Sequence, residues 1–281
     1  MKTKAFGWTG VQVPLVGQGT WRMVEGGRRK AEREALSVGL DLGMTHLDTA
    51  EIYGDGRSEE LIAEVLRDRR RSDVFLVSKV HPKNASYHGT IAAAEQSLRR
   101  LRTDYLDLYL LHWPGSHPIE DTMRGMEALV TAGKIRFLGV SNFDVDELRA
   151  AMRGLTRQRI AANQVLYNLA TRGIERDLVP FCEREQIAVV GYTPFGNWPG
   201  RTSAGLRVLH EIGVRHGRTD RQVALRFLSR GPALFAIPKA SDVDHVRDNA
   251  GGGDFDLSAE EIDAIDRAFP GPHRTVPLAT G

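Results

Sequence analysis

Four polar residues stand at or just after the ends of short apolar runs, and their types suit acid–base chemistry. Asp48 ends one run, Lys79 ends the next and His112 a third, while Tyr53 lies in the loop after Asp48. Charged side chains are rarely buried without a partner, so we expect Asp48 and Lys79 to form an ion pair. On this pair alone, a purely structural salt bridge and a catalytic pair are equally good interpretations.

Tyr53 and His112 favour the catalytic interpretation. A phenol has a pKa of about 10 and is a reluctant proton donor at neutral pH. We expect the Lys79 ammonium to lower the pKa of Tyr53 by stabilising its phenolate, with Asp48 holding the ammonium and His112 orienting a substrate oxygen. Such a group suits protonation of a carbonyl oxygen as hydride reaches its carbon. None of the four supplies hydride, so the chemistry requires a nicotinamide cofactor.

The elements that must position these residues are short apolar runs alternating with amphipathic segments, a pattern typical of repeated βα units. Eight runs are expected to be strands, as many as a closed (β/α)8 barrel needs, and polar residues at strand ends would then meet at its active face. They are Leu15–Gly19, Thr45–Asp48, Val74–Lys79, Leu106–His112, Ile135–Val140, Ala161–Gln164, Ala188–Tyr192 and Leu234–Pro238.

We therefore predict a TIM barrel that forms a single domain over residues 1–281, since barrels of ~250 residues routinely do so. Residues 4–13 are expected to form a hairpin that closes the bottom of the barrel. Asp244–Ala250 and Ser258–Phe269 predict extra C-terminal helices. Apolar residues three and four apart predict helices over 61–66 and 91–101, with Ser58 as a candidate N-cap of the first.

A doubly wound sheet is the competing architecture. A dinucleotide-binding sheet of that kind normally carries Gly-x-Gly-x-x-Gly after its first strand. Here the first run ends Gly17-Gln18-Gly19-Thr20-Trp21, without a third glycine. The sequence therefore argues against that architecture.

Composition excludes several classes of protein. A net charge of +2 and 26% charged residues give no reason to expect nucleic-acid binding. No apolar run is long enough for a membrane span or a signal peptide. The single cysteine, Cys182, fits a reducing compartment, and no metal-ligand spacing occurs. We expect a cytoplasmic monomer without a metal.

Four ordered motifs resemble those of the aldo-keto reductases, over nearly the whole chain from Val16 to Phe269. They are the runs 43–54 (GMTHLDTAEIYG), 110–114 (LLHWP), 139–143 (GVSNF) and 237–241 (IPKAS). The resemblance implies a catalytic tetrad at the four positions named above, and reduction of small aldehydes and ketones with NADPH, or more weakly NADH. The runs 16–21 (VGQGTW) and 163–168 (NQVLYN) are similar to a bacterial branch that includes methylglyoxal reductases.

The same resemblance implies binding residues. Trp21 and Trp113 would wall the substrate pocket beside Tyr53 and His112. Ser141, Asn142 and Gln164 would hold the nicotinamide carboxamide, and Tyr192 would stack on its ring. The remaining cofactor contacts would come from Gly19, Thr20, Trp21, Asp48, Thr193, Pro194, Phe195, Ile237, Lys239, Ala240, His245, Asp248 and Asn249.

The expected phosphate site departs from the family pattern of a lysine, then a serine, then an arginine six residues after the lysine. Lys239 is present, but Ala240 and His245 stand at the other two positions. Ser241 is expected to replace the missing hydroxyl in part, and an imidazole is mostly neutral at pH 7. We therefore expect NADPH to be preferred by a smaller margin than in relatives with the arginine.

Two other functions remain open from the sequence. One is a non-catalytic, cofactor-sensing subunit with the same fold, which the absence of an extra N-terminal segment disfavours. The other is a hydrolase with a carboxylate pair, which would need a second acid near Asp48. Glu51 is expected to be a solvated loop charge and His46 a hydrogen-bonded core histidine, while His81, His88 and His117 are expected to be loop residues without a chemical task.

Overall fold

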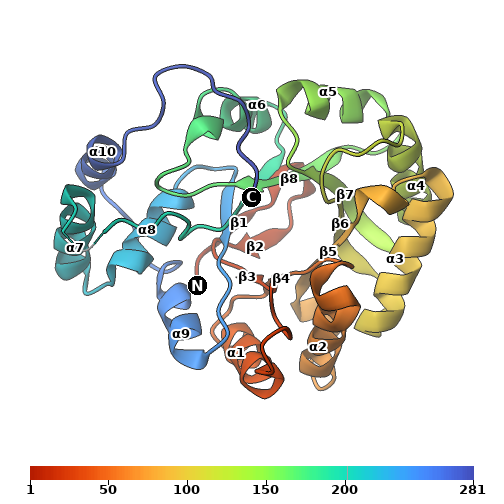
Figure 1. Ribbon diagram of the computed structural model, residues 1–281, viewed down its shortest axis with the longest axis horizontal. Helices are drawn as coiled ribbons and strands as arrows, with labels where there is room; N and C mark the ends of the chain where they lie inside the picture. Colours follow the sequence, from red (N-terminus) through yellow and green to blue (C-terminus); the bar gives the residue numbers. More distant parts are fainter. Residues whose placement is uncertain (201) are drawn as a thin grey trace.

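The computed structural model, which describes residues 1–200 and 202–281, shows a barrel of eight parallel strands surrounded by helices (Figure 1). Neighbouring strands follow one another in chain order from β3 to β10. Bridges from Val16 to Ala236 and from Gly19 to Lys239 join the first and last strands and close the ring, so the predicted barrel is confirmed. The strands are β3 (Gln18–Gly19), β4 (His46–Asp48), β5 (Phe75–Val80), β6 (Leu106–Leu111), β7 (Ile135–Ser141), β8 (Ile160–Leu166), β9 (Ala188–Tyr192) and β10 (Leu234–Ile237).

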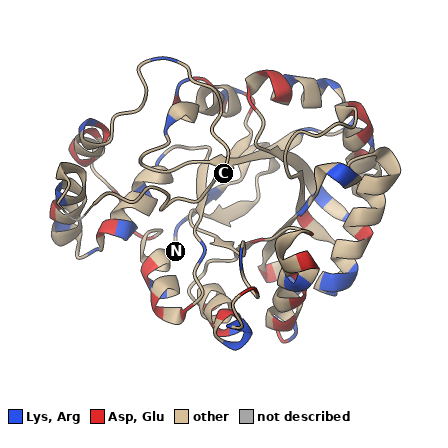
Figure 2. Ribbon diagram, in the orientation of Figure 1, with Lys and Arg blue, Asp and Glu red and all other residues tan. Residues whose placement is uncertain are grey.

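The helices outside the barrel carry charged residues of both signs (Figure 2). They are α1 (Arg29–Asp41), α2 (Arg57–Leu66), α3 (Tyr87–Leu101), α4 (Ile119–Thr131), α5 (Val145–Arg153), α6 (Leu178–Arg184), α7 (Ala204–His216), α8 (Asp220–Leu228), α9 (Val243–Gly251) and α10 (Ala259–Ala268). In the described parts of the chain none of them is long and apolar enough to cross a membrane.

One prediction about the C-terminal helices was wrong. The helix α9 packs against α1 and α8 and completes the barrel's outer ring, so it is not an addition to the fold. The added helices are α10 and α7, which lies between β9 and β10, and these two pack against each other (Figure 1). In the 198–203 loop before α7, Arg201 lies outside the described residues.

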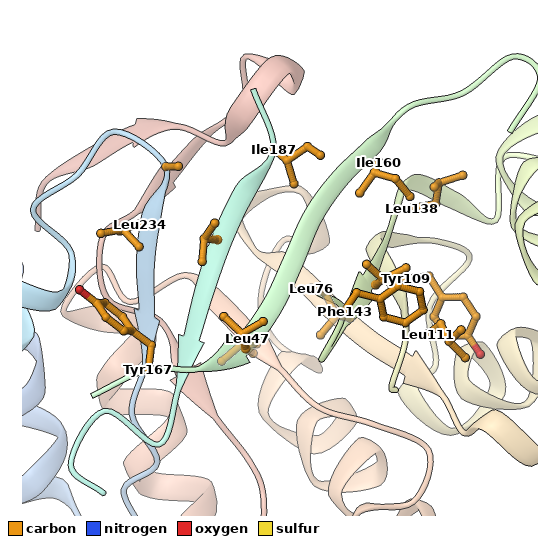
Figure 3. Packing of buried hydrophobic residues seen from close by; sticks show 14 of the residues in the cluster. Leu47, Leu76, Tyr109, Leu111, Leu138, Phe143, Ile160, Tyr167, Ile187 and Leu234 are labelled. Carbon is orange, nitrogen blue, oxygen red and sulfur yellow. The ribbon is translucent and has the colours of Figure 1, made fainter. Parts of the chain in front are cut away.

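Alternating side chains along each strand separate two apolar layers. On β5, Phe75 and Val77 belong to the cluster inside the barrel, whereas Leu76 and Val80 belong to the layer between strands and helices. Figure 3 shows part of this outer layer. Because strand side chains alternate between faces, Lys79 shares the interior face with Phe75 and Val77. The polar residues gather at interior positions near the C-terminal ends of the strands.

A hairpin of β1 (Thr3–Ala5) and β2 (Gln12–Pro14) closes the opposite end of the barrel, as predicted. Phe6 packs on Phe75 and Phe235, with ring centroids 4.9 and 5.0 Å apart. The indole of Trp8 donates to a main-chain carbonyl at the start of β8, at 2.8 Å. This end of the barrel is therefore filled by aromatic side chains.

Ser58 does not cap α2. Gly56 is the N-cap residue, with a φ of 85° that glycine adopts readily. The buried Ser58 hydroxyl instead donates to the carbonyl of Thr20 at 3.4 Å. Cys182 is fully buried on α6, and burial raises its pKa to about 12, which agrees with the prediction of a packing residue.

His46 lies two residues before Asp48 on β4 and is 1% exposed. Its ring packs edge-on against Phe6 and Phe75, which confirms a core position. Neither ring nitrogen has a hydrogen-bond partner among the described residues, so the expectation of a hydrogen-bonded histidine was wrong. Burial lowers the pKa of His46 to about 4.

We expect His46→Leu to reduce the loss of stability in acid. Between pH 6.5 and 4 the unfolded chain protonates this histidine and the native state does not, so stability falls as pH falls, by about 3 kcal/mol for a shift of this size. Urea unfolding at pH 7 and pH 4.5 measures the difference. His88→Leu, which removes an exposed histidine, should keep the wild-type pH slope, and equal slopes in all three proteins would contradict the assignment.

Candidate active site

Asp48, Tyr53, Lys79 and His112 meet at the mouth of the barrel, where β4, β5 and β6 end. The Lys79 ammonium lies 2.6 Å from Asp48 Oδ1 and 3.5 Å from Tyr53 Oη. On the other side of the phenol, His112 Nε2 is 3.4 Å from Tyr53 Oη. The structure therefore brings together the four residues that the sequence singled out, with the phenol between a cation and an imidazole.

The ion pair is buried, and each of its charges is satisfied. Lys79 is fully buried and donates a second hydrogen bond to the carbonyl of Thr49, at 2.7 Å. The second oxygen of Asp48, Oδ2, accepts from Gln164 Nε2 at 2.7 Å. Burial lowers the pKa of Lys79, while Asp48 opposes that shift. A buried pair with its remaining polar atoms hydrogen-bonded in this way tolerates the low-dielectric interior.

The expected effect of Lys79 on Tyr53 was wrong in direction. Burial raises the pKa of the Tyr53 phenol well above its ordinary value, and the Asp48 and Tyr192 oxygens raise it further. The reason is that Asp48 offsets the field of the ammonium it binds, so burial dominates. Tyr53 therefore keeps its proton at neutral pH.

His112 is neutral in this site. Burial, with help from the nearby Lys79 and His81, lowers its pKa to about 2. Its Nδ1 atom is buried and has no partner among the described residues. A neutral imidazole offers hydrogen bonding through Nε2 and does not compete with Tyr53 as a cationic acid.

The loop that carries Tyr53 is fixed by Glu51. One oxygen of the Glu51 carboxylate accepts from the main-chain N–H of His81 at 2.6 Å and from Asn84 Nδ2 at 3.0 Å. These contacts join the loop after β4 to the loop after β5. The expectation that Glu51 is a solvated loop charge was therefore wrong, because its carboxylate binds protein donors. These partners lie 30 and 33 residues away in the sequence, so no local pattern reveals them.

One of the two tryptophans expected to wall a substrate pocket, Trp113, borders this group. The Trp113 ring lies 4.7 Å from that of His112 and 4.9 Å from that of His81. Trp21 is 52% exposed, and the guanidinium of Arg22 lies 4.5 Å from its ring centre. His81 was not expected to have a role here, yet its ring belongs to the same aromatic wall.

Polar groups suited to an amide lie beside the four residues, at the ends of β7, β8 and β9. Tyr192 Oη donates to Asn142 Oδ1 at 2.9 Å. Asn142 Nδ2 donates to the carbonyl of His112 and to Ser141 Oγ, each at 3.2 Å. Gln164, bound to Asp48 through its nitrogen, keeps its amide oxygen as an acceptor. These donors and acceptors, next to the partly exposed Tyr192 ring, fit a nicotinamide carboxamide.

A cationic group lies at the end of β10, beyond the amide-binding positions. Lys239 is exposed and donates to Ser241 Oγ. His245 Nδ1 lies 2.9 Å from Asp242 Oδ2, and Arg28 lies 3.9 Å from the same carboxylate. The Lys239 ammonium and the Arg28 guanidinium, with the His245 imidazole as a further polar group, fit a phosphate.

The other residues expected at the cofactor differ in their surroundings. The Asp248 carboxylate is occupied by Thr219, whose hydroxyl donates to it at 2.7 Å. Asn249 is buried on α9. Thr20 is also buried, and its hydroxyl donates to the carbonyl of Asp48. Gly19 pairs with Lys239 at the barrel seam. The remaining expected residues lie at the ends of β9 and β10: Thr193, Pro194, Phe195, Ile237 and Ala240.

Comparison with known proteins agrees with this arrangement. Residues 15–269 match the model of the aldo/keto reductase family. The chain belongs to that family. It is 45% identical to methylglyoxal reductase YeaE of Escherichia coli, with 97% of each chain covered. It is 35% identical to glyoxal reductase of Bacillus subtilis, over 92% of this chain and 89% of the relative.

Solved structures of aldo/keto reductases are also similar. One from Klebsiella pneumoniae, in complex with NADPH, has a TM-score of 0.91 and 43% identity, covering 100% of this chain and 99% of the other. Another from that organism, in complex with NADP and acetate, has a TM-score of 0.90 and 41% identity over the whole of both chains.

Two residues of this aldo/keto reductase were missed by the sequence reasoning, although they lie at the cationic group. Arg28 contacts Asp242, and Glu32 accepts a hydrogen bond from Ser241 at 3.0 Å. Both come from the start of the chain, about two hundred residues from their partners. No local motif marks them, since the barrel seam alone brings the two segments together.

We expect Lys79→Met to destabilise this aldo/keto reductase by ~3–5 kcal/mol, because the Asp48 carboxylate would stay buried without its cation. Urea unfolding at pH 7 measures the loss. Lys83→Met, which removes an exposed lysine from the next loop, should leave stability nearly unchanged. Equal unfolding midpoints for the two variants would show that the ion pair does not carry this energy.

Proposed function

We propose that this aldo/keto reductase uses NADPH to reduce small aldehydes and ketones to alcohols, with 2-oxoaldehydes such as methylglyoxal among its substrates. The observation that carries the proposal is the position of Tyr53 Oη, within 3.5 Å of both the Lys79 ammonium and the His112 imidazole. The two relatives above, named for methylglyoxal and glyoxal, support the substrate class.

The chain's own residues would hold the cofactor along the mouth of the barrel. Ser141, Asn142 and Gln164 would bind the carboxamide, Tyr192 would stack on the ring and Lys239 would bind the adenosine phosphate. NADPH, when bound, supplies the hydride that reaches the carbonyl carbon. The NADPH complex of a similar structure supports this choice of cofactor.

The proton would come from Tyr53. Its raised pKa keeps the donor form fully populated, and the phenolate left after transfer would be stabilised by the Lys79 ammonium, which Asp48 holds in place. His112, neutral and beside the phenol, would orient the carbonyl oxygen through Nε2. The low pKa of His112 favours Tyr53 over the imidazole as the acid.

The remaining expectations form part of the same proposal. Residues 1–281 would act as one domain and as a cytoplasmic monomer, with small carbonyl compounds rather than nucleic acids as partners. No observation favours the non-catalytic, cofactor-sensing alternative. Turnover of an aldehyde, followed by nicotinamide absorbance, separates the two functions directly.

We expect Tyr53→Phe to lower kcat by ~10²–10⁴-fold, because it removes the proton donor and little volume. The dissociation constant for NADPH, measured by fluorescence titration, should stay close to that of the wild type. Tyr105→Phe removes a hydroxyl from a tyrosine that stacks under Arg71, away from the mouth, and serves as the control. Near-wild-type turnover in Tyr53→Phe would exclude this residue as the acid.

We expect small aldehydes to be better substrates than bulky ketones. The Trp113 ring lies 4.7 Å from that of His112, and Trp21 would form the second aromatic wall. The loop over 198–203 is too short to enclose a steroid. Comparing kcat/KM for methylglyoxal, benzaldehyde and a ketosteroid measures the preference. A higher kcat/KM for the steroid would contradict the proposed substrate class.

A further inference from the structure

A buried carboxylate, Glu32, lies next to the cationic group at the end of β10. It is 2% exposed near the start of α1. No lysine, arginine or histidine of the described residues lies within 4.0 Å of its oxygens. A buried charge without a cationic partner is costly unless hydrogen bonds satisfy it, so its hydrogen-bond donors decide what it does.

Two donors satisfy Glu32. Oε2 accepts from the main-chain N–H of Val24 at 2.8 Å, and Oε1 accepts from the Ser241 hydroxyl at 3.0 Å. The same Ser241 oxygen accepts from the Lys239 ammonium. Lys239, Ser241 and Glu32 therefore form a relay in which the serine bridges a cation and an anion.

This relay determines what the β10 loop offers to a phosphate. A hydroxyl has one proton to donate, and that of Ser241 is already held by Glu32. With Ala240 at the preceding position, Ser241 was the expected replacement for the missing hydroxyl donor. Ser241 presents its lone pairs instead. The negative charge of Glu32 is then separated from the Lys239 ammonium by a single hydroxyl group.

We propose that Glu32 sets how strongly this enzyme distinguishes NADPH from NADH, by withholding the Ser241 proton and part of the Lys239 charge from the cofactor's 2′-phosphate. The inference rests on the proposed function, in which Lys239 binds that phosphate. Glu32 is then a specificity-determining residue that acts through two others without touching the cofactor itself.

Glutamine at this position separates the charge from the packing. Its amide oxygen can still accept the hydrogen bond from the main-chain N–H of Val24. That bond holds a β-branched residue whose φ of 65° is unfavourable for such side chains. Its amide nitrogen donates to Ser241 Oγ and so frees the serine proton for a phosphate. Glu34→Gln is the matched control, because Glu34 lies on the exposed side of the same helix.

The test is fluorescence titration of NADPH and NADH against the purified proteins. Glu32→Gln should lower the dissociation constant for NADPH by ~10- to 100-fold, the size expected for a hydrogen bond to a charged group, and change that for NADH by less than twofold. Glu34→Gln should change neither. Equal tightening of both cofactors, or none, in Glu32→Gln overturns the inference.

Ser241→Ala keeps the proposal testable if Glu32→Gln does not fold. Under the relay the serine gives no proton to the phosphate, so its loss should change NADPH binding by less than twofold. A five-fold or greater loss of NADPH binding with NADH unaffected would show that the hydroxyl serves the phosphate directly, against the inference. In the Glu32→Gln background, Ser241→Ala should abolish the gain.

Lys239→Met separates this inference from the proposed function. Loss of the preference for NADPH supports phosphate binding at Lys239. An unchanged preference in Lys239→Met would mean that the phosphate is bound elsewhere and that the proposed cofactor site is wrong. A lost preference in Lys239→Met, combined with wild-type binding in Glu32→Gln, would overturn only the role of Glu32.

Discussion

The buried ion pair of Asp48 and Lys79 is the constraint on which the rest of the site depends. Asp48 pairs with Val77 across β4 and β5. Lys79, two residues after Val77, lies on the same interior face of β5, and its ammonium reaches the Asp48 carboxylate. Two charges in the interior require every remaining donor and acceptor to be used. The carbonyl of Thr49 and the amide of Gln164 meet that need, which fixes the positions of β4, β5 and β8 relative to one another.

The same pair determines the chemistry available to Tyr53. An ammonium alone would lower the pKa of a neighbouring phenol, and the sequence predicted that result from residue types. In the folded chain the carboxylate offsets the ammonium and burial dominates, so the pKa rises. The sequence indicated which groups meet, but the sign of a pKa shift depends on the burial and on all the charges around a group, which only the fold supplies.

Strand positions and strand-end residues could be predicted because both are local. Apolar runs mark strands, and a polar residue at the end of a run with the right alternation lies inside the mouth. Two of the errors concern contacts made across long stretches of chain. Glu51 binds the next loop, and α9 completes the ring because it packs against α1. Nothing in the amphipathic pattern of 244–250 reveals that partner, so a barrel helix could not be distinguished from an added one.

Closure of the barrel explains why a carboxylate on the first helix can influence a lysine after the last strand. The strands follow chain order around the ring, so the proposed roles pass in sequence from proton transfer at β4 to β6, through the amide at β7 to β9, to the phosphate at β10. The seam between Gly19 and Lys239 then places β10 beside β3. The two segments farthest apart in sequence become neighbours, and Glu32 meets Ser241 across 209 residues. Selectivity for the phosphate is therefore open to adjustment from α1, by a residue that contacts none of the four groups proposed for proton transfer.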